Sequence, residues 1–386
     1  MSDHPIFTAD HDALRASVRG LLAREVTPYV EEWEQTTFPD TVFRCLGDAG
    51  LLGLGKPVEY GGQGIDTVSG LVLAEELGRV NSAGVAMGIS VHTDMAMPPI
   101  LAFGSEQQKS EWLVPAIRGE TILCLGISEP EAGSDVAAIR TTARRDGDDY
   151  VISGSKMFIT NGLRAHAIVL LTREPDTGHG YTLLLVPMSL SGITRERPLS
   201  KVGLRASDTA VLTFDAVRVP ASAVIGSAGE GFKHIMWELQ GERLTAAAYC
   251  VGAAEWLIET ALRYARERRA FGKPIAEHQA IRHRLAEMAM ELEAARQLVY
   301  STAWKVGQGT CGAGDIAIAK LFATRSASTI ADSAMQIHGG AGCMTEYGVE
   351  RAWRDLRTFR IGAGTDEIML DIIGRAIGRT KTEDQR

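Results

Sequence analysis

The chain has 386 residues, 45% of them hydrophobic, and a formal net charge of -8 at pH 7. This length allows two or three domains with a large buried core, and the acidic balance excludes the basic face that a nucleic-acid-binding protein needs. The five cysteines are scattered without a Cys-x-x-Cys pair, so we expect no metal site and no disulfide framework.

Residues 1–119 are expected to form a helical domain. Apolar residues recur at helical spacing near its start, as in Leu14, Val18, Leu21 and Leu22. The first residues contain acidic side chains and no apolar signal core, which favours a cytoplasmic protein. No apolar run approaches the ~20 residues needed to cross a bilayer, so we expect no membrane span.

From residue 120 to residue 228 the pattern becomes that of strands. Short apolar or alternating runs are bounded by Gly, Asp, Asn or Pro, which is typical of antiparallel strands joined by turns. Their regular spacing predicts a small β-barrel or sandwich domain. The runs cover residues 122–127, 150–153, 167–172, 181–186 and 210–219.

Helical spacing returns in residues 229–386. Ile281, Leu285, Met288 and Leu292 are separated by alternating steps of four and three residues, which predicts the inward-facing seam of a bundle. A Gly-rich break at 307–314 separates that helix from the next. The expected fold class is therefore α+β, with an N-terminal helical domain, a middle β domain and a C-terminal four-helix bundle.

Four motifs, in order along nearly the whole chain, resemble those of the acyl-CoA dehydrogenase family. They read LGISEPEAGSD from Leu125, KMFITN from Lys156, ERRAFGKPI from Glu267 and QIHGGAG from Gln336. The resemblance implies non-covalently bound FAD and the conversion of a saturated acyl-CoA to its trans-2-enoyl-CoA. It also implies that the electrons leave to an electron-transfer flavoprotein.

The resemblance assigns residues to both halves of FAD. The flavin half would be contacted by Leu125, Ile127, Ser128, Gly133, Ser134, Phe158 and Thr160. The adenylate half would be held from a neighbouring subunit by Arg268, Phe271, Gln279, Gln336, Gly339 and Gly340. Thr365 and Glu367 would contact the adenine half within one subunit. Such sharing implies at least a dimer, and the family resemblance implies a homotetramer built as a dimer of dimers.

The catalytic base is the point at which this chain departs from the commonest family pattern. Ala363 stands where that pattern has a glutamate, and alanine cannot accept a proton. Isovaleryl-type and long-chain-type members carry the base on the first helix of the bundle, where Glu242 precedes Arg243 here. We therefore expect Glu242 to be the general base. Ser134, Arg243, Ala363 and Gly364 are expected to contact the substrate, Ala363 through its backbone N–H.

Other functions on the same scaffold stay open from the sequence. An acyl-CoA oxidase, a flavin monooxygenase or a non-catalytic acyl-CoA-binding homologue would share these motifs. The run 339–342 is not a nicotinamide-dinucleotide fingerprint, because it follows a helical pattern rather than a strand. Branched chains and medium or long chains are both compatible with a base at Glu242.

Overall fold

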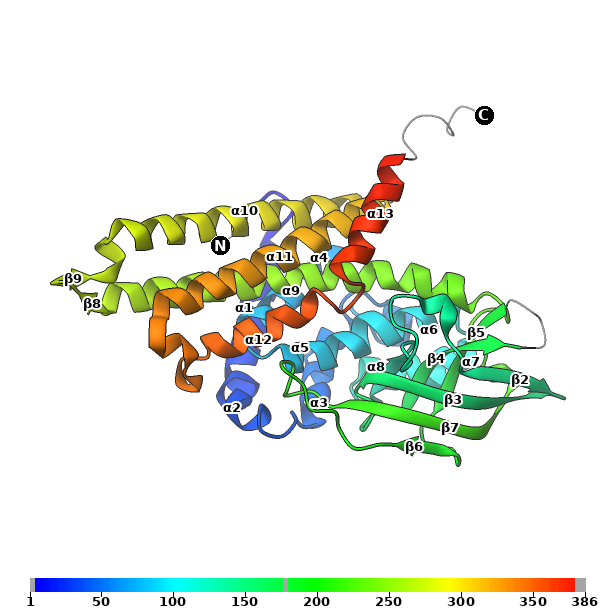
Figure 1. The fold of residues 1–386 in the computed structure, drawn as a ribbon. Coiled ribbons are helices and arrows are strands. Elements are labelled where there is room, and N and C mark those ends of the chain that lie inside the picture. Colours follow the sequence, from blue (N-terminus) through cyan, green and yellow to red (C-terminus); the bar gives the residue numbers. More distant parts are fainter. Residues whose placement is uncertain (1–3, 176–179, 379–386) are drawn as a thin grey trace.

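The computed structural model describes residues 4–175 and 180–378, in which the main sheet lies at one end of a molecule made mostly of helices (Figure 1). A helical N-terminal part is followed by strands and then by long helices, so the expected fold class is confirmed. Within the described residues no helix is both long and apolar enough to cross a membrane. Residues 1–3 and 379–386 of the predicted first and last domains lie outside the described part.

The N-terminal part consists of short helices and turns around a buried apolar core. Its α-helices are α1 (Ala9–Glu25), α2 (Val30–Trp33), α3 (Thr41–Asp48), α4 (Thr67–Arg79), α5 (Ala83–Ser90), α6 (Met97–Phe103), α7 (Glu106–Gln108) and α8 (Val114–Ile117). Two segments wind as π-helices, η4 (Val91–Ala96) and η5 (Lys109–Leu113). A π-helical segment is rare and often marks a functional site.

The middle part is one curled sheet in the order β1-β4-β2-β3-β7-β6, with β5 paired to β4. Its strands are β1 (Leu123–Gly126), β2 (Thr142–Asp146), β3 (Asp149–Thr160), β4 (Ala167–Glu174), β5 (Gly180–Pro187), β6 (Ile193–Arg195) and β7 (Thr209–Pro220). The purely antiparallel arrangement expected from the sequence is wrong in one respect, because β1 and β2 run parallel to β4. The chain between β1 and β4 contains the β2–β3 hairpin, which is long enough for the crossover that parallel strands require.

The C-terminal part is built on three long helices. They are α9 (Gly231–Glu267), α10 (Gln279–Gly307) and α11 (Ala313–His338), followed by α12 (Val349–Phe359) and α13 (Asp366–Gly378). A hairpin of β8 (Arg269–Ala270) and β9 (Lys273–Pro274) joins α9 to α10 at the far end of the bundle (Figure 1). The break expected at 307–314 separates α10 from α11.

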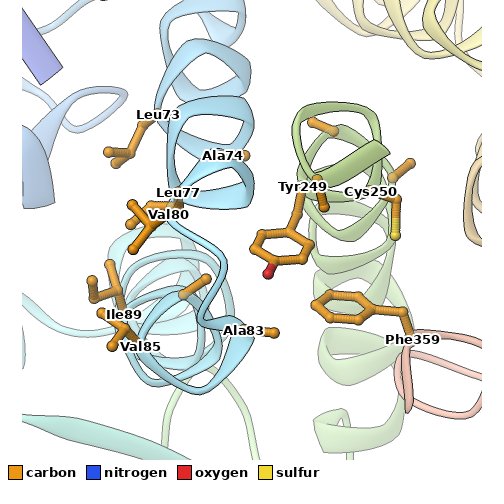
Figure 2. Close-up of a cluster of buried hydrophobic side chains, with 14 of the residues drawn as sticks. Leu73, Ala74, Leu77, Val80, Ala83, Val85, Ile89, Tyr249, Cys250 and Phe359 are labelled. Atoms are coloured by element: carbon orange, nitrogen blue, oxygen red, sulfur yellow. The ribbon is translucent and has the colours of Figure 1, made fainter. Parts of the chain in front are cut away.

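Helices α4 and α9 cross closely and join the N-terminal part to the bundle. A Cβ at Gly252 on α9 would overlap the backbone carbonyl of Glu75 on α4, and one at Gly78 would overlap the carbonyl of Tyr249. The Tyr249 ring stacks on Phe359, with ring centroids 4.7 Å apart (Figure 2). This packing fixes where α9, which carries Glu242, lies relative to the rest of the molecule.

Candidate functional site

Glu242 lies on the buried face of α9 with 9% of its surface exposed. Burial raises the pKa of its carboxyl to about 7, a shift that the charges of Arg243 and Lys320 oppose and that of Asp94 reinforces. A carboxyl with a pKa near neutrality is ionised in a useful fraction at neutral pH and is still basic enough to take a proton. Glu242 therefore has the properties of a general base.

Two cationic side chains hold the Ala363–Gly364 segment beside α9. Arg243 Nε donates to the backbone oxygen of Ala363 at 3.0 Å, and Lys320 Nζ donates to that of Gly364 at 2.7 Å. Ala363 adopts a left-handed conformation with φ 56°, which is unfavourable for a residue other than glycine. The two hydrogen bonds stabilise this conformation and thus fix the orientation of the Ala363 peptide.

The segment is also anchored on its other side. Asp366 Oδ2 accepts hydrogen bonds from Arg325 at 3.0 Å and from Arg360 at 2.6 Å. Burial alone would raise the pKa of Asp366, but the two arginines outweigh it and lower the pKa. Asp366 is thus a structural anchor rather than a base. Sequence reasoning placed Ser134, Arg243, Ala363 and Gly364 in one substrate-binding group. The structure brings the last three together beside Glu242, whereas Ser134 lies on the loop after β1.

Two further acids lie next to Glu242. Glu238 is one helical turn earlier on α9 and is 2% exposed, and Asp94 belongs to η4, which packs against both α9 and β1. Burial raises the pKa of Glu238, the charge of Glu242 raises it further, and the charge of Arg243 opposes this rise while that of Asp94 adds to it. The segment η4 therefore lies between α9 and strand β1 and places Asp94 near the two glutamates of α9.

The predicted flavin-contact residues gather where the loop after β1 meets β3. The N–H of Met157 donates to the backbone oxygen of Ser128 at 2.9 Å. Lys156 is fully buried, and its Nζ donates to Glu129 Oε1 at 2.8 Å and to the backbone oxygen of Ile127 at 2.9 Å. Burial lowers the pKa of Lys156 to about 8, and this internal ion pair holds the loop against β3.

Phe158 has a geometry suited to an aromatic ligand. It lies at a bulge between β3 and β7, with φ 64° and 63% of its surface exposed. Thr160 ends the same strand. Leu125, on β1, and Ile127, just after it, are half-buried, and Gly133 and Ser134 are exposed. Their arrangement leaves an exposed aromatic side chain at the end of β3, close to the loop that follows β1.

The predicted adenylate-contact residues lie at the opposite end of α9. Arg268 ends that helix, and Phe271, on the β8–β9 hairpin, is 95% exposed. The Tyr264 ring on α9 stacks on His338 at 4.3 Å, which brings the end of α11 to the same place. That end carries Gln336, Gly339 and Gly340, and Gln279 begins α10 beside the hairpin.

This group does not meet the flavin-side group within one chain. The start of α9 packs against β5 at Gly231, and a helix of 37 residues is about 55 Å long. Thr365 and Glu367 form a third location, at the start of α13, where the Thr365 hydroxyl oxygen accepts from the N–H of Ile368 at 3.3 Å. One chain thus presents the predicted cofactor residues in separate places.

Sequence reasoning missed several charged residues of the site. Lys320 and Glu238 each stand within apolar helical stretches, and a lone charge on an apolar helix face is the signal that would have singled them out. Asp94 sits in an apolar run that reads as ordinary buried helix. The Lys156–Glu129 pair joins two of the quoted motifs, but only the tertiary structure shows that these side chains meet. No cluster of metal-ligating side chains occurs among residues 4–175 and 180–378.

Comparisons with known proteins match the chain nearly end to end. Family models described as the N-terminal, middle and C-terminal domains of acyl-CoA dehydrogenase match residues 8–120, 124–217 and 229–378. The mitochondrial long-chain specific acyl-CoA dehydrogenase of Sus scrofa is 37% identical over 381 residues, 97% of this chain and 88% of the relative. The mitochondrial short-chain specific enzyme of Rattus norvegicus is 38% identical over 367 residues, 94% of this chain and 89% of the relative.

One of the similar solved structures contains a bound flavin cofactor. The glutaryl-CoA dehydrogenase of Mycobacterium smegmatis in complex with FADH2 matches with a TM-score of 0.93 and 32% identity, covering 100% of this chain and 98% of that one. The outward-facing Phe158 and the neighbouring loop backbone fit a flavin ring, because an exposed aromatic side chain can pack on its face. This chain belongs to the acyl-CoA dehydrogenase family, whose members are FAD-dependent oxidoreductases of fatty acid metabolism.

Proposed function

We propose that the protein introduces a trans double bond between the α- and β-carbons of a saturated acyl-CoA. The observation that carries this proposal is Glu242, a buried carboxyl with a pKa of about 7 beside the Ala363–Gly364 segment. Glu242 removes the α-proton while a hydride leaves the β-carbon, and the remaining electron pair forms the new double bond. FAD, when bound, supplies the acceptor for that hydride.

The Ala363 segment and the nearby cations would make the α-proton more acidic. The backbone N–H of Ala363 donates to the thioester oxygen, where negative charge develops as the proton leaves. Arg243 and Lys320 hold the segment through its carbonyl groups, so the donor is oriented before the substrate arrives. The cations also favour the ionised form of Glu242.

The electrons are proposed to leave to an electron-transfer flavoprotein. Family membership supports this acceptor, and the Gly339–Gly342 run supports it indirectly. That run follows the end of α11 rather than a strand, so it lacks the strand–turn–helix context of a nicotinamide-dinucleotide site.

The acyl group is proposed to be branched or of medium to long chain, because the base lies on α9. Sequence identity to the relatives does not distinguish between acyl groups of different length. The relatives named for long-chain and for short-chain substrates are 37% and 38% identical to this chain.

We propose that the active assembly is a homotetramer in which each FAD contacts two subunits. The separation of the flavin-side residues from Arg268 and Phe271 along α9 supports this arrangement. The exposed apolar side chains on the bundle, including Met290, Trp304 and Ile377, also support it, because large apolar residues on a surface favour contact with a partner. The cytoplasmic location expected from the sequence stays a prediction.

An anaerobic titration of the purified holoenzyme tests the reaction. Saturated acyl-CoA thioesters of graded length and branching are added, and loss of the oxidised flavin absorbance is followed. We expect rapid bleaching with a subset of them, followed by reoxidation with electron-transfer flavoprotein. No bleaching with any thioester would support a non-catalytic homologue, and fast turnover with oxygen that releases stoichiometric hydrogen peroxide would support an oxidase.

A further inference from the structure

Glu238 is a buried carboxyl that the proposed reaction does not use. It precedes Glu242 by four residues, so both side chains lie on the same face of α9, one turn apart. It is 2% exposed, and neither of its carboxyl oxygens has a hydrogen-bond partner within the described part of the chain. Buried polar atoms are nearly always hydrogen-bonded in native proteins, so this carboxyl requires an explanation.

The structural element opposite Glu238 is also polar and irregular. Asp94 lies on the π-helical segment η4, and its Oδ2 accepts from the hydroxyls of Ser90 and Thr93, each at 3.0 Å. Asp94 is close enough for its charge to act on both Glu238 and Glu242, and its side chain keeps exposed surface. Polar groups of α9 and η4 therefore converge next to the proposed base.

Neighbouring cations do not satisfy Glu238. Arg243 donates through Nε to the backbone oxygen of Ala363, and Lys320 donates to that of Gly364. The charge of Lys56 acts on Asp94. The charge of Arg243 opposes the rise in the pKa of Glu238, but no ion pair to Glu238 forms within the described residues. If the contact between α9 and η4 served packing alone, an apolar residue would be more stable here than an unpaired carboxyl.

We propose that Glu238 and Asp94 form a polar subsite that binds a hydrogen-bonding group of the thioester substrate. This inference rests on the proposed function, because Glu242 defines where the α-carbon lies. One helical turn spans about 5.4 Å, which corresponds to roughly four carbon–carbon bonds. Two parts of an acyl-CoA fit this distance: a hydroxyl on the acyl chain, and an amide of the pantetheine arm beyond the sulfur.

Equilibrium binding to the oxidised holoenzyme tests the subsite without turnover. Calorimetry compares trans-2-hexenoyl-CoA, its 6-hydroxy analogue and S-ethyl trans-2-hexenethioate, which has no amide. The proteins are the parent, Glu238→Leu and a control, Glu267→Leu, which changes an exposed glutamate at the far end of α9. The control is expected to bind all three ligands as the parent does.

Each ligand source gives a distinct pattern. A hydroxyl subsite predicts that the parent binds the 6-hydroxy analogue on the order of tenfold more tightly than hexenoyl-CoA, and that Glu238→Leu abolishes this preference. A pantetheine subsite predicts that Glu238→Leu weakens both CoA thioesters by a similar factor and leaves the amide-free thioester unchanged. Equal affinities of parent and Glu238→Leu for every ligand would overturn the proposal.

The design separates this inference from the proposed function. If Glu238→Leu does not retain FAD, the same titrations are made with Glu238→Ala, for which the same patterns are expected. If Glu242→Gln still reduces its flavin at the parental rate, Glu242 is not the base. The affinity differences between the parent and Glu238→Leu would not be affected by that result. If Glu242→Gln loses flavin reduction by substrate but Glu238→Leu binds every ligand as the parent does, the subsite proposal is overturned and the proposed function stands.

Discussion

The environments of its acidic residues determine which carboxyl at this site can act as a base. Glu242 is buried and forms no ion pair within residues 4–175 and 180–378, and its pKa rises to about 7. Asp366 is held by two arginines and Glu367 is exposed, and the pKa of each is lowered. A base must keep its affinity for a proton near neutral pH, so Glu242 suits the role and the two acids nearest Ala363 in sequence do not.

The pKa of Glu242 predicts the pH dependence of flavin reduction. The carboxyl accepts the α-proton only when ionised, so the rate at saturating acyl-CoA should rise as pH increases through about 7 and level off above it. Anaerobic stopped-flow measurements between about pH 5.5 and pH 9 check this. A rate that is already constant above about pH 5, near the ordinary pKa of a glutamate, would contradict the burial argument.

Lys320 is expected to act as a positioning residue. Its charge lowers the pKa of Glu242, and its ammonium holds the oxygen of Gly364. Lys320→Met should therefore move the rising limb of the pH profile to higher pH and raise KM, while FAD content stays normal. Lys320→Arg, which keeps the charge and a donor, should restore most of the profile. An unchanged profile in Lys320→Met would show that the lysine only supports packing.

Single residues differed in how well they could be predicted from sequence. Glu242 could be proposed as the base because a local motif surrounds it and Ala363 leaves the commoner position without a carboxyl. Glu238, Asp94 and Lys320 could not, because their importance depends on which elements pack against them. A helical pattern shows that a charged residue faces inward, but not which neighbour it meets.

The sequence predicted which segments are helices and which are strands, but not how these elements pair or pack with one another. Alternating apolar residues marked the strands, yet such a pattern does not encode whether neighbours run parallel, and β1 pairs with β4 in parallel. The helical spacing within 281–299 marked the seam of α10. The crossing of α4 and α9 was not predicted. It depends on Gly78 and Gly252, and a glycine within a helical sequence does not indicate which other helix packs against it.

The close crossing of these helices gives a stability prediction. Gly252→Ala places a methyl group against the carbonyl of Glu75, so overpacking should destabilise the protein by about 1–3 kcal/mol. Gly241→Ala on the same helix meets no atom within 4 Å and should stabilise it by about 0.5–1 kcal/mol through helix propensity. Thermal denaturation of both variants should move Tm in opposite directions. Equal shifts would contradict the packing argument.

At the scale of the whole molecule, α9 separates two sets of predicted FAD contacts. Its start packs on the sheet, and its end carries Arg268 and the exposed Phe271. If the predicted contacts are correct, a single chain carries one part of the FAD site near each end of α9. A second copy would place the hairpin of one subunit beside the sheet of another.

This arrangement predicts how Arg268 contributes to cofactor retention. Arg268→Met should weaken FAD binding by roughly tenfold or more, because a charge-assisted hydrogen bond to a phosphate is lost. Arg263→Met, which changes another exposed arginine of α9, is the control and should retain FAD. Flavin content after dialysis and mass by light scattering check both variants. Full FAD occupancy in a stable monomer would contradict the shared site.

The measurement that tests the account most directly is anaerobic flavin reduction in Glu242→Gln. Glutamine keeps the shape of the side chain and removes its basicity, so FAD content and acyl-CoA binding should stay near normal. Reduction by substrate should slow by on the order of 10²–10⁴-fold or more, and adding Ala363→Glu should recover part of the rate by returning a carboxylate to the commoner position. Reduction at the parental rate in Glu242→Gln would show that Glu242 is not the base.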